Sequence, residues 1–252
     1  MGRGSTAGLP DRRRADTHLV ELGLFESRAK AQAAIAAGLV TADGQPVRKP
    51  SDTIPITASV AAEAPHPWVS RGGVKLAAAL DAFGIDPSSA VCLDAGASTG
   101  GFTDVLLARG AARVYAVDVG HGQLHPRLAG DARVVSLEGT DIRRLDPGSI
   151  PEPIGICVAD LSFISLKLVV PALKHRMKRL GYLVGLVKPQ FECGRDNVGR
   201  GGIVRDDAVR QAVLDDIARF VGEQGFAVLG TMPSPIEGGD GNREFLLGAR
   251  LG

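Results

Sequence analysis

A glycine-rich segment at residues 94–102, DAGASTGGF, is the part of the chain best suited to bind a ligand. It follows the apolar run AVCL, which predicts a buried strand, and precedes a predicted helix. Glycine lets a backbone approach a ligand closely, and a helix N-terminus offers free N–H groups to a carboxylate. Asp118 ends the next predicted strand, where an acid can accept hydrogen bonds from ribose hydroxyls. The pattern predicts a site for a nucleoside-containing cofactor.

The glycine spacing separates the cofactor classes. Gly96, Gly100 and Gly101 do not follow GxGxxG, and the chain has no GK[ST] element for a nucleoside triphosphate. The form DxGxSxGGF instead resembles the S-adenosylmethionine loop of class I methyltransferases. That resemblance implies S-adenosylmethionine as cofactor, with Asp94 holding the methionyl amino group through a backbone or water contact, Asp118 the ribose and Asp141 near the adenine. The implied cofactor-binding residues are Asp94, Gly96, Ser98, Gly100, Gly101, Phe102, Asp118, Asp141 and Asp160.

Four charged residues lie far apart in the sequence at predicted strand ends or in short motifs. They are Lys75 in SRGGVKL, Asp160 in VADLSF, Lys188 in LVKPQFE and Glu244 in the predicted terminal strand NREFLLGARL. Charged groups rarely end apolar strands without partners. In order, they match the Lys-Asp-Lys-Glu tetrad of the RrmJ/FtsJ-like ribose 2′-O-methyltransferases, and the resemblance implies that they are catalytic.

The chemistry accounts for these residue types. A ribose hydroxyl is a poor nucleophile at neutral pH, so methyl transfer needs a base or a stabilised oxyanion. Lys188 beside a second cation would accept the proton, and Asp160 would orient its amine. Lys75 would stabilise the developing oxyanion, and Glu244 would fix one of the lysines.

Residues 70–252 alternate predicted strands with helices, including a helix over 168–181. This alternation predicts an α/β fold with a mostly parallel, seven-stranded sheet covered on both faces, as in the Rossmann-like class I methyltransferases. Ligands of such sheets bind at the carboxyl ends of the strands, and the motifs above fall there.

Residues 11–60 predict a small α+β unit of two helices and a hairpin that turns at Asp43 and Gly44. Ser27 is the expected N-cap of the second helix. The apolar face of the first helix is predicted to be Leu19, Val20, Leu22 and Leu24. The motif SRAKAQAAIAAGLV, followed by DGQPV and KP, resembles the S4 RNA-binding domain.

The basic residues of the S4-like unit and of the loop VGRGGIVRD at 198–206 are the predicted RNA contacts, because RNA affinity comes largely from neutralised phosphates. A solvated helix face is the alternative for each of them. The candidates are Arg12, Arg13, Arg14, Arg28, Lys30, Arg48, Lys49, Arg195, Arg200 and Arg205.

Composition limits the remaining possibilities. The 252 residues carry 29 Lys and Arg against 28 Asp and Glu, a net charge of +1, which excludes a strongly basic nucleic-acid protein. No apolar window is long enough for a membrane span, and residues 1–10 predict a flexible tail without a secretory signal. Three cysteines without a CxxC pair predict no metal site and a reducing, cytoplasmic location. Residues 61–69 predict a linker, and no protein partner is implied.

Taken together, an S4-like unit and an FtsJ-like domain over 70–252 resemble the TlyA family of rRNA methyltransferases, also called hemolysin A. The blocks that carry this resemblance are SRGGVKL, DAGASTGGFTDVLL, VDVGHGQL, ADLSFISL and VKPQFE. It implies 2′-O-methylation of cytidines in rRNA, with ribosomal subunits as partners. Two alternatives remain at this point. One is a methyltransferase of a small-molecule acceptor, which the weak charge bias favours, and the other is a non-enzymatic RNA-binding or hemolysin-like protein, against which the intact tetrad counts.

Overall fold

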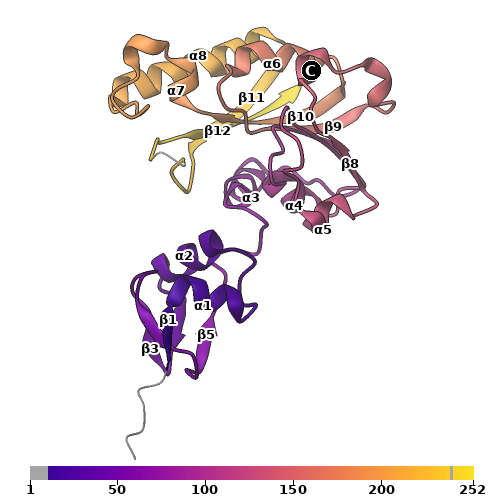
Figure 1. Ribbon diagram of the computed structural model, residues 1–252. Coiled ribbons are helices and arrows are strands. Elements are labelled where there is room, and N and C mark those ends of the chain that lie inside the picture. The colour runs from indigo at the N-terminus through magenta and orange to yellow at the C-terminus, as the bar shows by residue number, and fades with distance from the viewer. Residues whose placement is uncertain (1–10, 239–240) are drawn as a thin grey trace, which may run out of the picture. The chain divides into compact units, whose positions relative to one another are not determined.

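The computed structural model describes residues 11–238 and 241–252, and the chain divides into two compact units between Pro67 and Trp68 (Figure 1). The tail predicted over residues 1–10 lies outside the described residues. No helix in the described ranges is long and apolar enough to cross a membrane. Each unit has its own buried core.

The first unit contains helices α1 (Ala15–Glu21) and α2 (Arg28–Ala36). Ser27 caps α2 by accepting a hydrogen bond from the Lys30 N–H at 3.4 Å, as predicted. Leu19 and Ile35 are fully buried between the helices and the strands. The prediction was wrong for Leu22 and Leu24, which are exposed because α1 ends at Glu21 and does not extend its apolar face to them.

Short strands complete the first unit. β1 (Arg12–Arg14) pairs with β4 (Thr53–Pro55), and β2 (Val40–Ala42) pairs with β3 (Gln45–Pro46) through the predicted turn. Asp43 and Gly44 both have positive φ there, which a tight hairpin turn of this kind requires. β2 also pairs with β5 (Val60–Ala62), so the predicted linker range of 61–69 begins with residues of a strand.

The second unit is built on one seven-stranded sheet of order β11-β12-β10-β9-β6-β7-β8, and the predicted fold class is confirmed. Adjacent strands pair in parallel from β10 through β8, whereas β12 is antiparallel to both of its neighbours. The strands are β6 (Val91–Ala95), β7 (Arg113–Val117), β8 (Val134–Leu137), β9 (Ile154–Ala159), β10 (Met177–Val187), β11 (Phe226–Pro233) and β12 (Phe245–Leu251).

Helices cover both faces of this sheet (Figure 1). One face carries α3 (Gly72–Phe83), α4 (Gly101–Ala108) and α5 (Pro126–Ala129), and the other carries α6 (Leu166–Lys174) and α8 (Asp207–Glu223). Short helices α7 (Pro189–Glu192), η1 (Ile142–Arg144), η2 (Pro147–Ser149) and η3 (Arg195–Asn197) lie in the connections.

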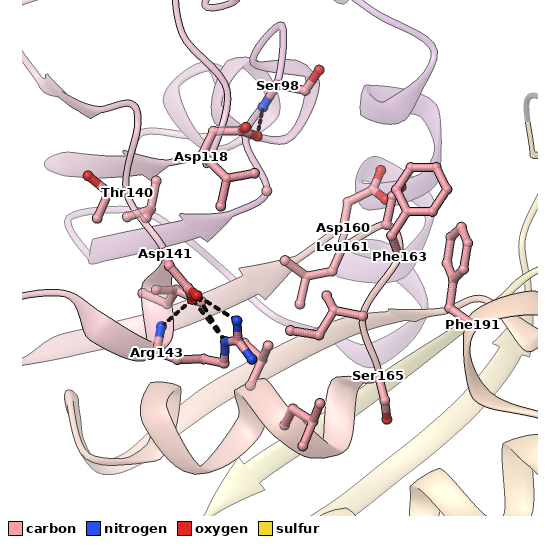
Figure 2. Close-up of a pocket in the computed structure, with 18 of the residues that line it drawn as sticks. Ser98, Asp118, Thr140, Asp141, Arg143, Asp160, Leu161, Phe163, Ser165 and Phe191 are labelled. Atoms are coloured by element: carbon pink, nitrogen blue, oxygen red, sulfur yellow. Dashed lines mark hydrogen bonds and ion pairs between the residues drawn. The ribbon is translucent and has the colours of Figure 1, made fainter. Parts of the chain in front are cut away.

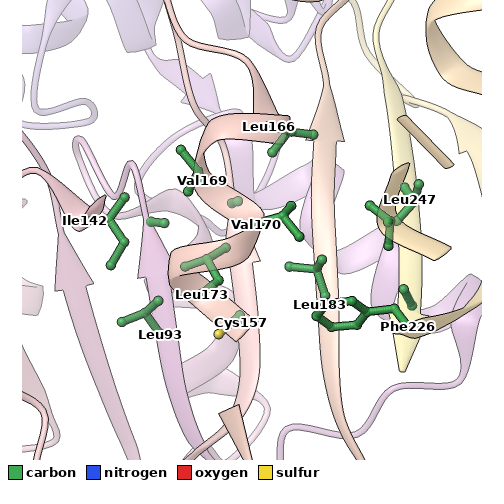
Figure 3. Packing of buried hydrophobic residues seen from close by; sticks show 14 of the residues in the cluster. Leu93, Ile142, Cys157, Leu166, Val169, Val170, Leu173, Leu183, Phe226 and Leu247 are labelled. Atoms are coloured by element: carbon green, nitrogen blue, oxygen red, sulfur yellow. The ribbon is translucent and has the colours of Figure 1, made fainter. Parts of the chain in front are cut away.

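Helix α6 shows how the sequence forms the core. Leu166, Val169, Val170 and Leu173 recur at helical spacing and are buried against the sheet (Figure 3). The helix predicted over 168–181 was too long, because the chain has already joined the sheet at Met177, which pairs with Ile154. Since β6, β7, β9 and β10 are parallel, the residues that follow them meet at one edge of the sheet.

Candidate active site

The glycine-rich loop after β6 has a backbone that only glycine adopts easily at two positions. Gly96 has a φ of +82°, and a Cβ atom there would lie 2.3 Å from the carbonyl oxygen of Asp160. Gly100 has a φ of +94° at the start of α4, and a Cβ atom there would lie 2.3 Å from Leu128. The loop is therefore closely packed against the segments that follow β7 and β9.

Asp118, directly after β7, holds this loop in place. Its Oδ2 accepts a hydrogen bond from the Ser98 N–H at 2.8 Å (Figure 2), and its Oδ1 accepts one from the Gly120 N–H at 2.7 Å. Each carboxylate oxygen has a second lone pair, so Asp118 keeps acceptor capacity toward the cleft that it lines.

The larger cleft at this edge of the sheet has a volume of about 740 Å³. Val117, Ile142 and Leu161 give it apolar walls, and Gly96, Ser98, Asp118, Asp141 and Asp160 also line it. Asp141 caps η1 and forms an ion pair with Arg143 at 2.6 Å, and the Arg143 side chain lowers the pKa of this carboxyl (Figure 2). Arg143, which no sequence motif indicated, takes up most of the acceptor capacity of Asp141.

Two of the predicted cofactor residues, Asp94 and Gly100, line neither cleft at this edge of the sheet, and Asp94 is a buried carboxyl. It is fully buried in β6, and its Oδ2 accepts hydrogen bonds from the Thr103 N–H at 2.9 Å and the Thr103 hydroxyl at 2.7 Å. Its Oδ1 has no hydrogen-bond partner among the described residues. Burial raises the pKa of Asp94 to about 7, and the carboxyl fastens the first turn of α4 to the sheet.

The raised pKa of Asp94 leads to a prediction about stability. The folded protein retains the Asp94 proton to a higher pH than the unfolded chain, in which Asp titrates near 4. The stabilisation from Asp94 is therefore complete below about pH 4 and is lost as the pH rises from about 4 to 7. Relative to the parent, Asp94→Asn should gain unfolding free energy across this window. Urea denaturation at a series of pH values, followed by the fluorescence of Trp68, the single tryptophan, measures this.

Asp131→Asn serves as a control, because the pKa of Asp131 is lowered whereas that of Asp94 is raised. Arg133 lowers the pKa of Asp131 to about 2, so that carboxylate stabilises the fold above about pH 4 and loses its contribution as the pH falls toward 2. A difference between Asp94→Asn and the parent that stays constant from pH 4.5 to 7.5 would contradict the assignment of a raised pKa to Asp94.

A smaller cleft of about 230 Å³ adjoins the glycine-rich loop and is lined by Lys75 and Asp160. Lys75 forms a buried ion pair with Glu244, with 2.5 Å between Nζ and Oε2. Lys188 forms an ion pair with Asp160, with 2.6 Å between Nζ and Oδ1, and also donates to the Ser162 hydroxyl at 3.0 Å. The four predicted catalytic residues thus form two ion pairs, and one member of each pair faces this cleft.

Elements of the sheet edge position these pairs. Lys75 lies in the first turn of α3, Asp160 follows β9 and Lys188 follows β10. Glu244 was predicted within the terminal strand, but β12 begins one residue later, at Phe245. Phe102 is buried at the start of α4 and lines the smaller cleft, together with Gly101 and Ser98.

Two aromatic residues that were not predicted from the sequence line the larger cleft. Phe163 is 90% exposed, and its ring lies 5.0 Å from that of Phe191, between centroids (Figure 2). The backbone of Phe163 has a φ of +65°, which is unusual for a bulky residue. Its position three residues after Asp160 was the available signal, although its exposure depends on the fold.

The predicted RNA contacts divide into two groups. Arg14 and Arg28 both pair with the buried carboxylate of Asp16, at 3.1 Å and 2.7 Å. Arg13 pairs with Glu21, Lys30 pairs with Glu26, and Arg12 donates to Thr53. The remaining five are exposed and form no ion pair within residues 11–238 and 241–252, namely Arg48, Lys49, Arg195, Arg200 and Arg205.

Comparison with known families agrees with this geometry. The model of the FtsJ-like methyltransferase family matches residues 68–251, and that of the S4 domain matches residues 13–58. Nearly the whole chain is also similar to TlyA of Mycobacterium tuberculosis, named as a 16S/23S rRNA (cytidine-2′-O)-methyltransferase, at 49% identity over 95% of this chain and 90% of that protein. This chain belongs to the TlyA family of FtsJ-like methyltransferases.

Other members carry a different name. Hemolysin A of Brachyspira hyodysenteriae is 41% identical over 92% of this chain and 98% of that protein. A solved structure of a hemolysin-named protein from Streptococcus thermophilus has a TM-score of 0.75 and 40% identity, and covers 96% of this chain and 90% of that one. Membership of the TlyA family makes the protein an enzyme of the methyltransferase class and confirms the predicted S4-like unit.

Proposed function

We propose that this protein transfers a methyl group from S-adenosylmethionine to the ribose 2′-hydroxyl of cytidine in rRNA. The observation that carries the proposal is the smaller cleft, where Lys75 and Asp160 face the same space and each is held by a partner of opposite charge. The name of the Mycobacterium relative, which specifies this reaction, supports the choice of acceptor.

The residues of the larger cleft fit the proposed cofactor. Val117, Ile142 and Leu161 suit a flat apolar base, and Asp118 retains lone pairs for ribose hydroxyls. The Gly96–Gly101 loop, which borders both clefts, suits the amino-acid end of the molecule. When bound, S-adenosylmethionine supplies a methyl group on a positively charged sulfur.

The two ion pairs have different roles in the reaction, one in accepting the proton and the other in stabilising charge on the oxygen. We assign the acceptor hydroxyl to Lys188, which in its neutral amine form takes the proton as the carbon–oxygen bond forms and the carbon–sulfur bond breaks. Asp160 then stabilises the ammonium of Lys188 at 2.6 Å. Lys75, fixed by Glu244, stabilises the negative charge that develops on the oxygen.

The base of the nucleotide whose ribose is methylated needs an apolar surface on the enzyme when it leaves its RNA duplex or loop. Phe163 provides one beside Asp160, because its ring is almost fully exposed and is backed by Phe191. Enzymes that do chemistry on a base extrude that base, and unpaired bases stack on aromatic side chains. The S4-like unit, with the exposed cations at Arg48 and Lys49, would supply phosphate contacts elsewhere on the RNA.

Substitution of Phe163 tests this arrangement of the acceptor. Phe163→Ala should raise the KM for RNA by about 5- to 150-fold, since stacking contributes about 1–3 kcal/mol per base. Leu229→Ala, which removes an exposed side chain of β11 outside both clefts, is the matched control. Equal RNA kinetics for Phe163→Ala and Leu229→Ala would contradict the assignment.

The acceptor class is tested by incubating the protein with methyl-labelled S-adenosylmethionine and either purified ribosomal subunits or a pool of cell metabolites. Label on rRNA is the expected result. Label in a small molecule alone would favour the small-molecule alternative, and the absence of transfer in both incubations would contradict the proposed activity.

A further inference from the structure

The loop Val198–Asp206, here called the arginine loop, carries two of the exposed cations and is anchored at its base by one buried side chain. Asn242 is 1% exposed and uses both ends of its amide on this loop. Its Oδ1 accepts a hydrogen bond from the Val204 N–H at 3.0 Å, and its Nδ2 donates to the Gly202 carbonyl at 2.9 Å. The amide group of Asn242 therefore binds the loop backbone at two points, the Val204 N–H and the Gly202 carbonyl.

Asn242 belongs to the connection between β11 and β12 that also carries Glu244. The Asn242 carbonyl accepts a hydrogen bond from the Gly238 N–H at 2.9 Å, and the Glu244 carbonyl accepts one from the Ser234 N–H at 2.8 Å. Gly238 lies so close to Glu244 that a Cβ atom there would be 2.5 Å from Oε1. The same backbone segment therefore sets the positions of Asn242 and of the carboxylate that pairs with Lys75.

A second buried contact makes the anchor rigid. Arg210, which is 7% exposed on α8, donates to the Val204 carbonyl at 2.6 Å and pairs with Asp207. Val204 itself is 1% exposed, so both of its backbone polar groups are buried and satisfied by side chains from outside the loop. A buried backbone group that loses its partner is costly, so the loop has little freedom to move while Asn242 is present.

We propose that Asn242 is a positioning residue that joins the arginine loop to the Glu244 segment, so that the loop presents Arg200 and Arg205 to the RNA backbone while Glu244 holds Lys75. The enzyme then engages RNA phosphates through its catalytic unit as well as through the S4-like unit. This inference rests on the proposed function for its RNA contacts, but the structural connection through Asn242 does not.

Hydrogen exchange of the backbone amides tests the structural connection in the absence of RNA and cofactor. Asn242→Ala should accelerate exchange of the Val204 amide by about tenfold or more, because the buried N–H loses its acceptor. Asn197→Ala is the matched control, because Asn197 is exposed and its side chain bonds only locally, to the Cys193 carbonyl. Unchanged Val204 exchange in Asn242→Ala would overturn the proposal.

Kinetics with RNA test the positioning role. Asn242→Ala should lower kcat, through Glu244, and raise the KM for RNA about tenfold, whereas Asn197→Ala should change neither. In a background of Arg200→Ala and Arg205→Ala, Asn242→Ala should raise the RNA dissociation constant by no more than about twofold further, since the arginines that it presents are already gone.

An Asn242→Ala effect on RNA binding that is equally large with and without the two arginines would overturn the proposal. Asn242→Asp keeps the acceptor for the Val204 N–H but places a carboxylate oxygen against the Gly202 carbonyl. If Asn242→Ala does not fold, Asn242→Asp is used in the same measurements. A parent enzyme that methylates no RNA would refute the proposed function, whereas the exchange result would still decide whether Asn242 holds the loop.

Discussion

Lys188→Ala is expected to lower kcat for methyl transfer by about 10²- to 10⁴-fold, the range that positioned proton transfer contributes. Nζ of Lys188 lies 2.6 Å from Asp160 and 3.0 Å from the Ser162 hydroxyl, so its place at the sheet edge is closely defined. Because Lys188 does not line the larger cleft, the dissociation constant for S-adenosylmethionine should stay within about twofold of the parent value. Single-turnover rates and isothermal titration measure the two quantities separately.

The matched control for this variant is Lys167→Ala. Lys167 also pairs with an aspartate, Asp216, but it does so between α6 and α8 and lines neither cleft. A half-exposed pair at the surface contributes about 0–1 kcal/mol, and activity should be unchanged. If Lys188→Ala retained methyl transfer within about threefold of Lys167→Ala, the proton-accepting role of Lys188 would be wrong.

Glu244→Ala is expected to lower the unfolding free energy of the catalytic unit by about 3–5 kcal/mol, because it leaves the ammonium of Lys75 buried without a partner. Lys75 and Glu244 are 7% and 4% exposed. The double variant Lys75→Met with Glu244→Leu should restore the unfolding free energy to about the parent value or above, since well-packed apolar residues replace the pair. Methyl transfer should remain lost in both variants. Denaturation followed by Trp68 fluorescence reports on this unit.

Glu223→Ala provides the comparison for stability, because Glu223 forms an exposed ion pair with Arg219 on α8 and should contribute no more than about 1 kcal/mol. The double variant separates stability from catalysis. If it were stable and also active, Lys75 would have no role in stabilising the oxyanion. If Glu244→Ala were as stable as Glu223→Ala, the pair would not be buried as the structure has it.

Much of the catalytic unit could be predicted from the sequence, because strand and helix periodicities are local and the motifs fall where strands end. The seven strands and the position of the glycine-rich loop follow from such patterns. Element ends were less predictable. Leu22 and Leu24 fit a helical face by spacing but follow the end of α1, and the stretch from Met177 fits a helix by composition but pairs with β9.

Pairings between distant residues could not be obtained from local pattern. Lys75 and Glu244 are 169 residues apart in the chain, and only the folded sheet edge brings them together. The contact of Asn242 with the arginine loop likewise forms only in the folded chain, as does the burial of Asp16 between Arg14 and Arg28. Three of the arginines predicted as phosphate contacts form ion pairs with carboxylates of the S4-like unit. These pairs agree with the near-balanced charge of the chain, which is +1.

The most direct test of the central claim is to identify the methylated nucleoside. Ribosomal subunits that lack the modification are incubated with the protein and S-adenosylmethionine, and the rRNA is digested and analysed by mass spectrometry, with Lys188→Ala in parallel. The proposed function predicts 2′-O-methylcytidine with the parent enzyme and none with Lys188→Ala. A methyl group on a base, on another ribose, or on no nucleoside of either subunit would contradict it.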